Sequence, residues 1–454
     1  MLVIISDLHL TDGTSGETIR TGAFRTFRER IRDLAYDASW RSDERYAPIE
    51  CVDLVLLGDI IDVIRSSRWS EETPSLRPWG DHTSPGFADR VARITEDAIA
   101  NNKASLDVLK SLHEPRIMNV PPAGADGKPA TISHNLNARE RVPVPVRIHY
   151  LVGNHDWFFH LKGQGFDAIR KQIVDAIGLA NDPDIVFPHD PDESALIRQV
   201  YQEHRVFARH GDIFDPGNFE HDRDASSLGD AIVIELLNRF AIEVRKRLGG
   251  EIPEACEAGL REIDNVRPLS MIPVWVEGLV ERTCTEELAA QVKQIWNRLV
   301  HEFLKIDFVK DRPLGSSALI KLGFEISSDL SLTGLSDVVT WFSAKMGGRT
   351  ETFYPYAMHE RAFKEGWARF IVYGHTHRYE IVPLRSEQRD GETIDTLYVN
   401  SGTWRPVHEL ARFHPVQKQF VRYHVMTYLS FFKDEERKGR GFEVWSGALG
   451  SSAA

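Results

Sequence analysis

Aspartate, histidine and asparagine side chains gather in five short polar clusters that follow one another in a fixed order along this 454-residue chain. The clusters are Asp7-Leu8-His9, Gly58-Asp59, Gly153-Asn154-His155-Asp156, His210-Gly211-Asp212 and Gly374-His375-Thr376-His377. They offer carboxylate, carboxamide and imidazole groups without thiolates, a set that suits Mn²⁺, Fe or Zn²⁺. One ion seldom needs so many ligands, whereas two ions about 3.5–4 Å apart that share a carboxylate would use them all. The sequence therefore predicts a dinuclear metal site with Asp59 as its bridge. The expected ligands are Asp7, His9, Asp59, Asn154, His210, His375 and His377.

Short apolar stretches position these clusters. Each cluster follows one of the runs 2–5, 52–57, 148–152, 206–208 and 370–373, which are rich in β-branched residues and short enough to be buried strands. In an open α/β sheet, ligands bind beyond the carboxyl ends of the strands, so five strand ends can meet around one point. His375 and His377 are expected to alternate along an extended backbone and to point to one face.

The ordered set D-x-H, GD, GNHD, HGD and GHTH resembles the calcineurin-like metallophosphoesterase superfamily. The resemblance implies an α/β fold, a four-layer α/β/β/α sandwich, here with an inserted α-helical cap. It also implies how the ligands divide between two ions. Asp7, His9, Asp59 and His377 would hold one ion, and Asp59, Asn154, His210 and His375 the other.

The same resemblance implies a metal-dependent phosphohydrolase in which a metal-bridging hydroxide attacks phosphorus in line. His155 stands beside a ligand but outside the family's ligand set, and we expect it to stabilise the transition state or to protonate the leaving oxygen. Asp62 matches the second Asp of the family's GDxxD pattern, which orients that histidine. His155 and Asp62 are therefore the expected catalytic residues.

Two branches of the superfamily can be compared motif by motif. Protein Ser/Thr phosphatases carry Arg after the second Asp and Glu after GNH, where this chain has Val63 and Asp156, which argues against a protein phosphatase. The UDP-2,3-diacylglucosamine pyrophosphate hydrolases share D-x-H-L, HGD and GHTHR, matched here by residues 7–10, 210–212 and 374–378. That branch usually carries Arg where His155 stands.

Some polar residues near the clusters admit two interpretations. Asp156 and Asp212 could bond backbone at a turn or support a neighbouring ligand. Residues 400–404 could line a substrate pocket or form a plain turn. In the Pro-rich loop 65–86, local packing is favoured over a substrate wall or a phosphate contact. The loop side chains concerned are Arg65, Trp69 and Trp79.

The composition limits the partners and the compartment. The chain has 55 Lys and Arg against 67 Asp and Glu, and its net charge of −12 gives no general attraction to nucleic acid. Its three cysteines form no CxxC pair, so a reducing compartment is expected. With no signal-type N-terminus and no long apolar run, we expect a cytoplasmic protein without a transmembrane segment.

We expect a metallophosphoesterase core in two parts, 1–214 and 350–454, with a helical insert at 215–349 between them. Helical periodicity in the insert covers 228–248, 286–308 and 332–346, with hinges at 305–312 and at the Gly347-Gly348 pair. In the core we expect helices over 18–37 and 87–112, an exposed Pro-rich excursion over 119–145, and strands at 393–400 and 421–432. The last of these strands is expected to pair with 442–445 in a C-terminal hairpin.

The favoured function is hydrolysis of a phosphodiester, phosphomonoester or pyrophosphate bond in a small-molecule or nucleotide-type substrate. A nuclease of the same superfamily is an alternative and predicts a basic surface around the site. A non-catalytic interaction scaffold with this fold, such as the retromer subunit, is another and predicts eroded metal ligands. The sequence leaves open whether the insert is a cap, a lipid groove or a dimer interface, and it leaves open the oligomeric state.

Overall fold

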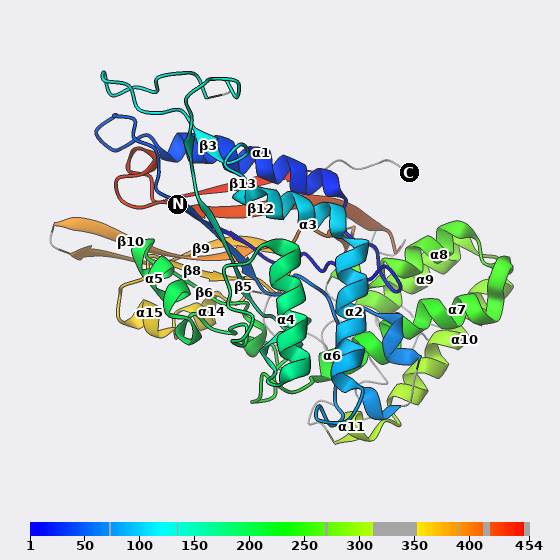
Figure 1. Cartoon of the computed structure of the whole chain (residues 1–454). Coiled ribbons are helices and arrows are strands. Elements are labelled where there is room, and N and C mark those ends of the chain that lie inside the picture. Colours follow the sequence, from blue (N-terminus) through cyan, green and yellow to red (C-terminus); the bar gives the residue numbers. More distant parts are fainter. Residues whose placement is uncertain are drawn as a thin grey trace.

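The computed structural model describes all residues except 72–73, 134, 268–270, 312–351, 390, 412–417 and 449–454. The chain is a mixed α/β protein with two large mixed sheets, helices packed on them and a group of helices to one side (Figure 1). The helix expected over 332–346 and the glycine pair Gly347-Gly348 lie outside the described residues.

The first sheet has the strand order β5-β2-β1-β12-β11-β7, with β13 paired to β12. Its strands are β1 (Leu2–Ile5), β2 (Val52–Leu57), β5 (Val146–Leu151), β7 (Val266–Arg267), β11 (Pro406–Leu410), β12 (Phe420–Phe431) and β13 (Phe442–Ala448). Strands β5, β2 and β1 run parallel, so the first three polar clusters emerge at the same edge. The C-terminal hairpin is confirmed, because β12 and β13 pair antiparallel.

The second sheet has the order β6-β8-β10-β9. Its strands are β6 (Val206–Ala208), β8 (Phe370–Tyr373), β9 (Tyr379–Arg389) and β10 (Glu392–Ser401). Strands β6, β8 and β10 are parallel, so the HGD and GHTH clusters also leave from one edge, and β9 is antiparallel to β10. The sequence did not predict β9 or β11. Figure 1 shows that the β9–β10 hairpin reaches beyond the rest of the sheet.

Alternating side chains connect the two sheets. Along β1, Leu2 and Ile4 are buried in one apolar cluster with Val206 and Val372 of the second sheet. The intervening residues of β1 turn to the opposite face, into the larger cluster that helices α1 to α4 complete. The second sheet has a further cluster on its own outer face, formed with α14 and α15. Each sheet therefore buries apolar side chains on both faces, as buried parallel strands require, although Ile381 of β9 and Val421 of β12 are exposed.

The helices that pack on the sheets are amphipathic. They are α1 (Thr21–Ala38), α2 (Phe87–Asn101), α3 (Lys103–Lys110), α4 (Gln164–Ile177), α5 (Ala195–Glu203), α14 (Tyr354–Ala357) and α15 (Arg361–Lys364). Phe24, Phe27 and Ile31 form the buried stripe of α1. The helix expected over 87–112 is interrupted at Asn102, because its side-chain amide donates to the carbonyls of Thr11 and Ala98.

The described part of the insert is mostly helical, but residues 215–227 have neither helix nor strand, and β7, which the sequence did not predict, pairs with β11 of the first sheet. It contains α6 (Leu228–Ile232), a π-helical turn η7 (Val233–Asn238), α7 (Arg239–Leu248), α8 (Glu254–Arg261), α9 (Ile272–Thr283), α10 (Glu286–Phe303) and α11 (Asp307–Lys310). The helix expected over 228–248 is thus continuous but widened at η7, and the one over 286–308 is split in two. Buried Phe240 and Trp296 pack edge to face between α7 and α10, so these helices share a packed core.

Two irregular parts of the chain matter for the site. The Pro-rich excursion starts and ends in a short strand pair, β3 (Asn119–Val120) with β4 (Val142–Pro143), and Figure 1 shows it projecting from the body. Residues 215–227, here called the strap, join the 3₁₀ turn η6 (Asp212–Phe214) to α6 without helix or strand. Among the described residues, no helix is both long and apolar enough to cross a membrane.

Candidate metal centre

The five polar clusters meet at the strand ends, and their backbone is unusual there. Asp7, His9, Asp59, His375 and His377 all have positive φ, between 44° and 69°. Non-glycine residues seldom adopt this left-handed conformation, which costs of the order of 1–3 kcal/mol each and is concentrated at functional sites. Five of the seven expected metal ligands therefore lie in strained turns directly after a strand.

This conformation corrects one expectation. His375 and His377 were expected to alternate along an extended backbone and to share a face, but strand β8 ends at Tyr373 and both histidines lie in the left-handed region. The curled turn sends the two rings to different partners. Nδ1 of His375 lies 2.9 Å from Oδ1 of Asn154, whereas Nε2 of His377 lies 2.9 Å from Nε2 of His9.

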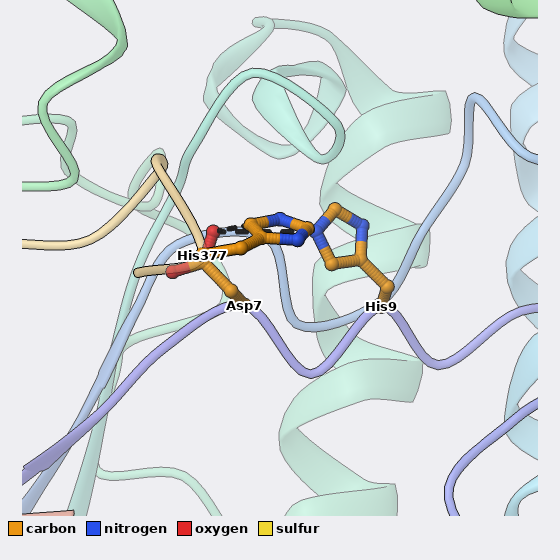
Figure 2. A group of neighbouring side chains, drawn as sticks. All are labelled: Asp7, His9 and His377. Carbon is orange, nitrogen blue, oxygen red and sulfur yellow. Dashed lines mark hydrogen bonds and ion pairs between the residues drawn. The ribbon is translucent and has the colours of Figure 1, made fainter. Parts of the chain in front are cut away.

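The first group of donors comprises Asp7, His9 and His377, from two strand ends in the first and second sheets (Figure 2). Nε2 of His377 lies 3.4 Å from Oδ1 of Asp7, and Nε2 of His9 lies 4.0 Å from the same oxygen. Asp7 is fully buried, and the ring edges of His9 and His377 face each other. These three side chains can hold one ion.

The second group comprises Asp59, His210 and His375, with the amide of Asn154 among them. Nε2 of His210 lies 3.3 Å from Oδ2 of Asp59 and 3.2 Å from Oδ1 of Asn154. Oδ2 of Asp59 also lies 3.6 Å from Nε2 of His9 in the first group. One carboxylate oxygen therefore stands between the two groups, as a bridging ligand must.

Three of the four histidines have their second ring nitrogen fixed by an acceptor. Nδ1 of His9 lies 2.8 Å from Asp62, Nδ1 of His210 lies 3.0 Å from the carbonyl of Leu57, and Nε2 of His375 lies 3.0 Å from Asp215. Metal-bound histidines are oriented in this manner, because the acceptor holds the proton on the far nitrogen and leaves the lone pair for the ion.

The fourth histidine is held differently. Nη2 of Arg267, which belongs to β7 inside the insert, donates to Nδ1 of His377 at 2.7 Å. A donor at Nδ1 places the ring proton on Nε2, the nitrogen that faces Asp7 and His9. Burial, followed by the charge of Arg267, lowers the pKa of His377 well below its ordinary value, so the ring is neutral. Ion binding through Nε2 therefore requires the contact with Arg267 to loosen.

The electrostatics of the centre call for a cation. Burial and the neighbouring charge of Asp59 raise the pKa of Asp7. Burial acts the same way on Asp59, but the charges of His210 and His155 outweigh it and hold the pKa of that carboxyl far below its ordinary range. Burial opposes the charge on His210 too, yet Asp59 and Asp7 raise its pKa to about 10. Carboxylate, amide and imidazole donors packed in this way fit divalent ions.

His155 and Asp62 lie together beside the first group. Nδ1 of His155 is 3.0 Å from Oδ1 of Asp62, whose other oxygen holds His9, and the backbone N–H of His155 donates to Oδ1 of Asp59 at 2.8 Å. Burial tends to lower the pKa of His155, but the charges of Asp62 and Asp59 raise it to about 10. The orientation of His155 by Asp62, expected from the motif, is the geometry observed.

Asp156 and Asp212 have structural partners. Asp156 accepts from the backbone N–H of Ile60 and from the hydroxyl of Tyr150, so it ties the third cluster to the second. Asp212 pairs with Arg223 of the strap at 2.9 Å, whereas the ring of His210 bonds a backbone carbonyl instead. Both carboxylates thus brace the loops that carry the ligands.

Residues 400–404 support the centre through hydrogen bonds to the loops that carry the ligands. Thr403 Oγ1 donates to the carbonyl of Asp7 at 2.7 Å, and the Asn400 amide donates to the carbonyl of Gly374 at 2.8 Å. Ser401 and Ser6 share a hydroxyl bond of 2.6 Å, and Ser6 also bonds the Asp7 carboxylate. These side chains are buried, so the segment positions ligand loops.

The side chains of loop 65–86 pack locally, as favoured from the sequence. Trp69 is fully buried and stacks on Phe158, and Trp79 stacks on Phe308 of α11. Arg65 is also fully buried, with Nε 3.6 Å from Asp264 and Nη2 bonded to the carbonyl of Ser15. This loop connects the core to the insert.

Close packing at the centre explains one glycine. A Cβ at Gly153 would lie 2.4 Å from Oδ1 of Asp59 and under 3 Å from the ring of His210. Only glycine allows the GNHD turn to approach the second cluster so closely.

Sequence reasoning missed several residues that complete the site. Asp215 was assigned to the start of the insert, yet it holds His375, and Asn218 accepts from the Asn154 amide at 3.3 Å. Arg267, also in the insert, reaches His377. The only available signal was that Asp215 follows the HGD cluster by three residues.

No protein-family model matches the sequence, and no curated protein matches it.

Proposed function

We propose that this protein is a dinuclear metal-dependent phosphohydrolase of the calcineurin-like metallophosphoesterase type, with a four-layer α/β/β/α core and an inserted helical cap. The observation that carries the proposal is the shared oxygen of Asp59, which lies 3.3 Å from His210 and 3.6 Å from His9. The second sheet, stacked on the first through a common apolar cluster, supports the four-layer arrangement.

The residues that would hold the ions are Asp7, His9, Asp59 and His377 in one group and Asp59, Asn154, His210 and His375 in the other. When bound, two divalent ions, Mn²⁺, Fe or Zn²⁺, supply Lewis-acid charge that polarises a phosphoryl oxygen and activates a water.

The protein's own contribution centres on His155. In its charged form, this ring donates a hydrogen bond from Nε2, because Asp62 occupies Nδ1. That donor stabilises negative charge on the phosphoryl oxygens or gives its proton to the leaving oxygen. The Asp62 carboxylate stabilises the charged form of the His155 ring and fixes its orientation. Burial of the donors excludes bulk water and strengthens each of these interactions.

The substrate we propose is a small phosphodiester, phosphomonoester or pyrophosphate of nucleotide type. Arg267 from the insert reaches the centre, so a substrate would have to fit between insert and core. Three arginines near the centre do not form an open basic groove: Arg65 and Arg405 are buried against Asp264, and Arg267 is bonded to His377. This arrangement gives a nuclease no specific support.

Reloading of the metal-free protein tests the proposal. Protein stripped with a chelator should hydrolyse none of three substrates: bis-p-nitrophenyl phosphate, p-nitrophenyl phosphate and a nucleoside diphosphate ester. Addition of Mn²⁺ should restore turnover of at least one of them. Metal analysis of the same samples should show that the ions of the Asp59 centre are lost with the activity and return with it. A loaded protein that turns over none of the three ester classes would contradict the proposed function.

A further inference from the structure

A second set of histidines and carboxylates lies apart from the Asp59 centre and shares no residue with it. His160, His189 and Asp224 come from three separate segments, and one donor atom from each lies within 4.8 Å of the others. His160 ends the 3₁₀ turn η4 (Trp157–His160), His189 precedes the turn η5 (Pro191–Glu193), and Asp224 belongs to the strap.

Both imidazoles direct a nitrogen at the same carboxylate oxygen. Nδ1 of His160 lies 2.6 Å from Oδ1 of Asp224, and Nε2 of His189 lies 3.4 Å from it. The ring centroids are 4.4 Å apart. A single charged histidine would be enough to neutralise one aspartate, so the second imidazole needs another explanation.

His189 is in the charge state that binds metal, and an ion would replace the proton between its Nε2 and Asp224. Its side chain is buried, and burial, followed by the charge of Arg223, lowers its pKa, so the ring is neutral and carries a lone pair. A neutral imidazole nitrogen aimed at a carboxylate and a second imidazole is a zinc-type donor set.

The outer contact that orients a metal-bound histidine is also present. Nε2 of His160, the nitrogen away from Asp224, lies 3.5 Å from Oε2 of Glu193. That carboxylate is itself fixed, because the backbone N–H of His189 donates to it at 2.9 Å. Carboxylate, histidine and ion in this order are the usual arrangement around protein-bound zinc.

We propose that His160, His189 and Asp224 form a third divalent-metal site, of zinc type, with Glu193 orienting His160. Two nitrogens and one oxygen fill three positions of a tetrahedron, and water takes the fourth, since the Asp224 side chain is 43% exposed. The ion takes the place of the proton that His160 now shares with Asp224.

The third ion would fasten the strap to the core. Asp215, Asn218 and Arg223 of the strap bond His375, Asn154 and Asp212 around the Asp59 centre. Asp224 directly follows Arg223, so an ion there fixes the end of the strap that leads into α6. The site is thus structural, and it does not depend on the proposed phosphohydrolase activity.

The test is Zn²⁺ stoichiometry by equilibrium dialysis and metal analysis of wild-type protein and three variants. Asp224→Asn should bind one ion fewer than wild type. The control is Asp192→Asn, since Asp192 is an exposed residue of η5 beside Glu193, and this variant should bind as many ions as wild type. Glu193→Gln should keep the site with an affinity about 10–100-fold weaker. Equal ion counts in Asp224→Asn, Asp192→Asn and wild type would overturn the proposal.

Asp59→Asn separates this site from the dinuclear centre. That variant should lose ions at the Asp59 centre and keep the one that depends on Asp224. If Asp59→Asn loses no ion while Asp224→Asn loses one, the third site stands and the dinuclear centre fails. If Asp224→Asn loses no ion while Asp59→Asn does, the third site is refuted alone.

Discussion

At the scale of single residues, the centre depends on which ring nitrogen of each histidine is free. Asp62, the Leu57 carbonyl and Asp215 fix the outer nitrogens of three histidines, and this leaves the inner ones for ions. His155 is held in the same way as His9, with Nδ1 on Asp62, and His9, Asp59 and His155 also lie close enough together to share an ion. Its proposed role in the reaction therefore rests on its place in the motif, outside the family's ligand set.

Replacing His155 by Ala should separate these two roles. We expect His155→Ala to keep its ions and to lose turnover by roughly 10²–10⁴-fold, the usual contribution of a general acid. Turnover of bis-p-nitrophenyl phosphate and metal analysis on one preparation would measure both. Loss of both ions in this variant would mean that His155 is a ligand or a structural residue.

At the scale of elements, strand β7 carries Arg267 from the insert to the first donor group. Because Arg267 places the ring proton of His377 on the nitrogen that must bind the ion, Arg267→Met should strengthen ion binding there. Removal of one charge-assisted hydrogen bond, worth about 1.5–3 kcal/mol, corresponds to roughly tenfold or more in affinity. Competition of Mn²⁺ with a chelating dye would measure it.

Arg245→Met is the matched control for this prediction, since Arg245 is an exposed arginine of α7 in the same insert. It should leave Mn²⁺ affinity unchanged. Weaker Mn²⁺ binding in Arg267→Met would show that Arg267 stabilises the metal-bound centre and does not oppose ion binding through the ring proton of His377.

The elements that the sequence predicted well are those with a strong local pattern. The five cluster-bearing strands and the helix over 228–248 have continuous apolar runs or helical periodicity, and the structure contains each of them, the helix with a π-helical turn at η7. β9 was missed because charged residues such as Glu380, Arg385 and Glu387 interrupt its alternation, and it is held by pairing with β10 instead. Backbone pairing with the next strand leaves no apolar alternation in the sequence of β9.

The same limit applies to the site. All seven expected ligands meet at one place, because their motifs lie directly after strands whose order in the sheet brings the ends together. The left-handed conformation of His375 and His377 could not be predicted, since their partners, such as Asp7 and Asn154 for His375, lie far away in the chain. Asp215 and Arg267 were missed because they belong to the insert, and no sequence motif indicates how the insert packs on the core.

At the scale of the whole molecule, the burial of one histidine makes stability depend on pH. His204, at the end of α5, is buried, and burial with nearby positive charge lowers its pKa to about 4. In the unfolded chain a histidine has a pKa of about 6.5, so between these values only the unfolded chain takes up the proton. The folded state therefore loses stability as the pH falls through this window and keeps it above about 6.5.

This effect should amount to about 2 kcal/mol between about pH 7 and about pH 5. Urea unfolding of chelator-treated protein at the two pH values would measure it. The variant His204→Gln should lack this part of the acid sensitivity, whereas His113→Gln, at an exposed site, should retain it. Equal pH dependence in His204→Gln and wild type would show that this histidine does not contribute.

In the proposed phosphohydrolase centre, Asp59 joins two metal ions. The most direct measurement is bound Mn²⁺ and turnover of bis-p-nitrophenyl phosphate in Asp59→Asn beside wild type, with the exposed Asp107→Asn of α3 as control. We predict that Asp59→Asn binds fewer ions at this centre and turns over at least about 10²-fold more slowly, since a charge shared by both ions is lost. Asp107→Asn should match wild type. Unchanged ion content and unchanged turnover in Asp59→Asn would show that Asp59 does not join two ions in a catalytic centre.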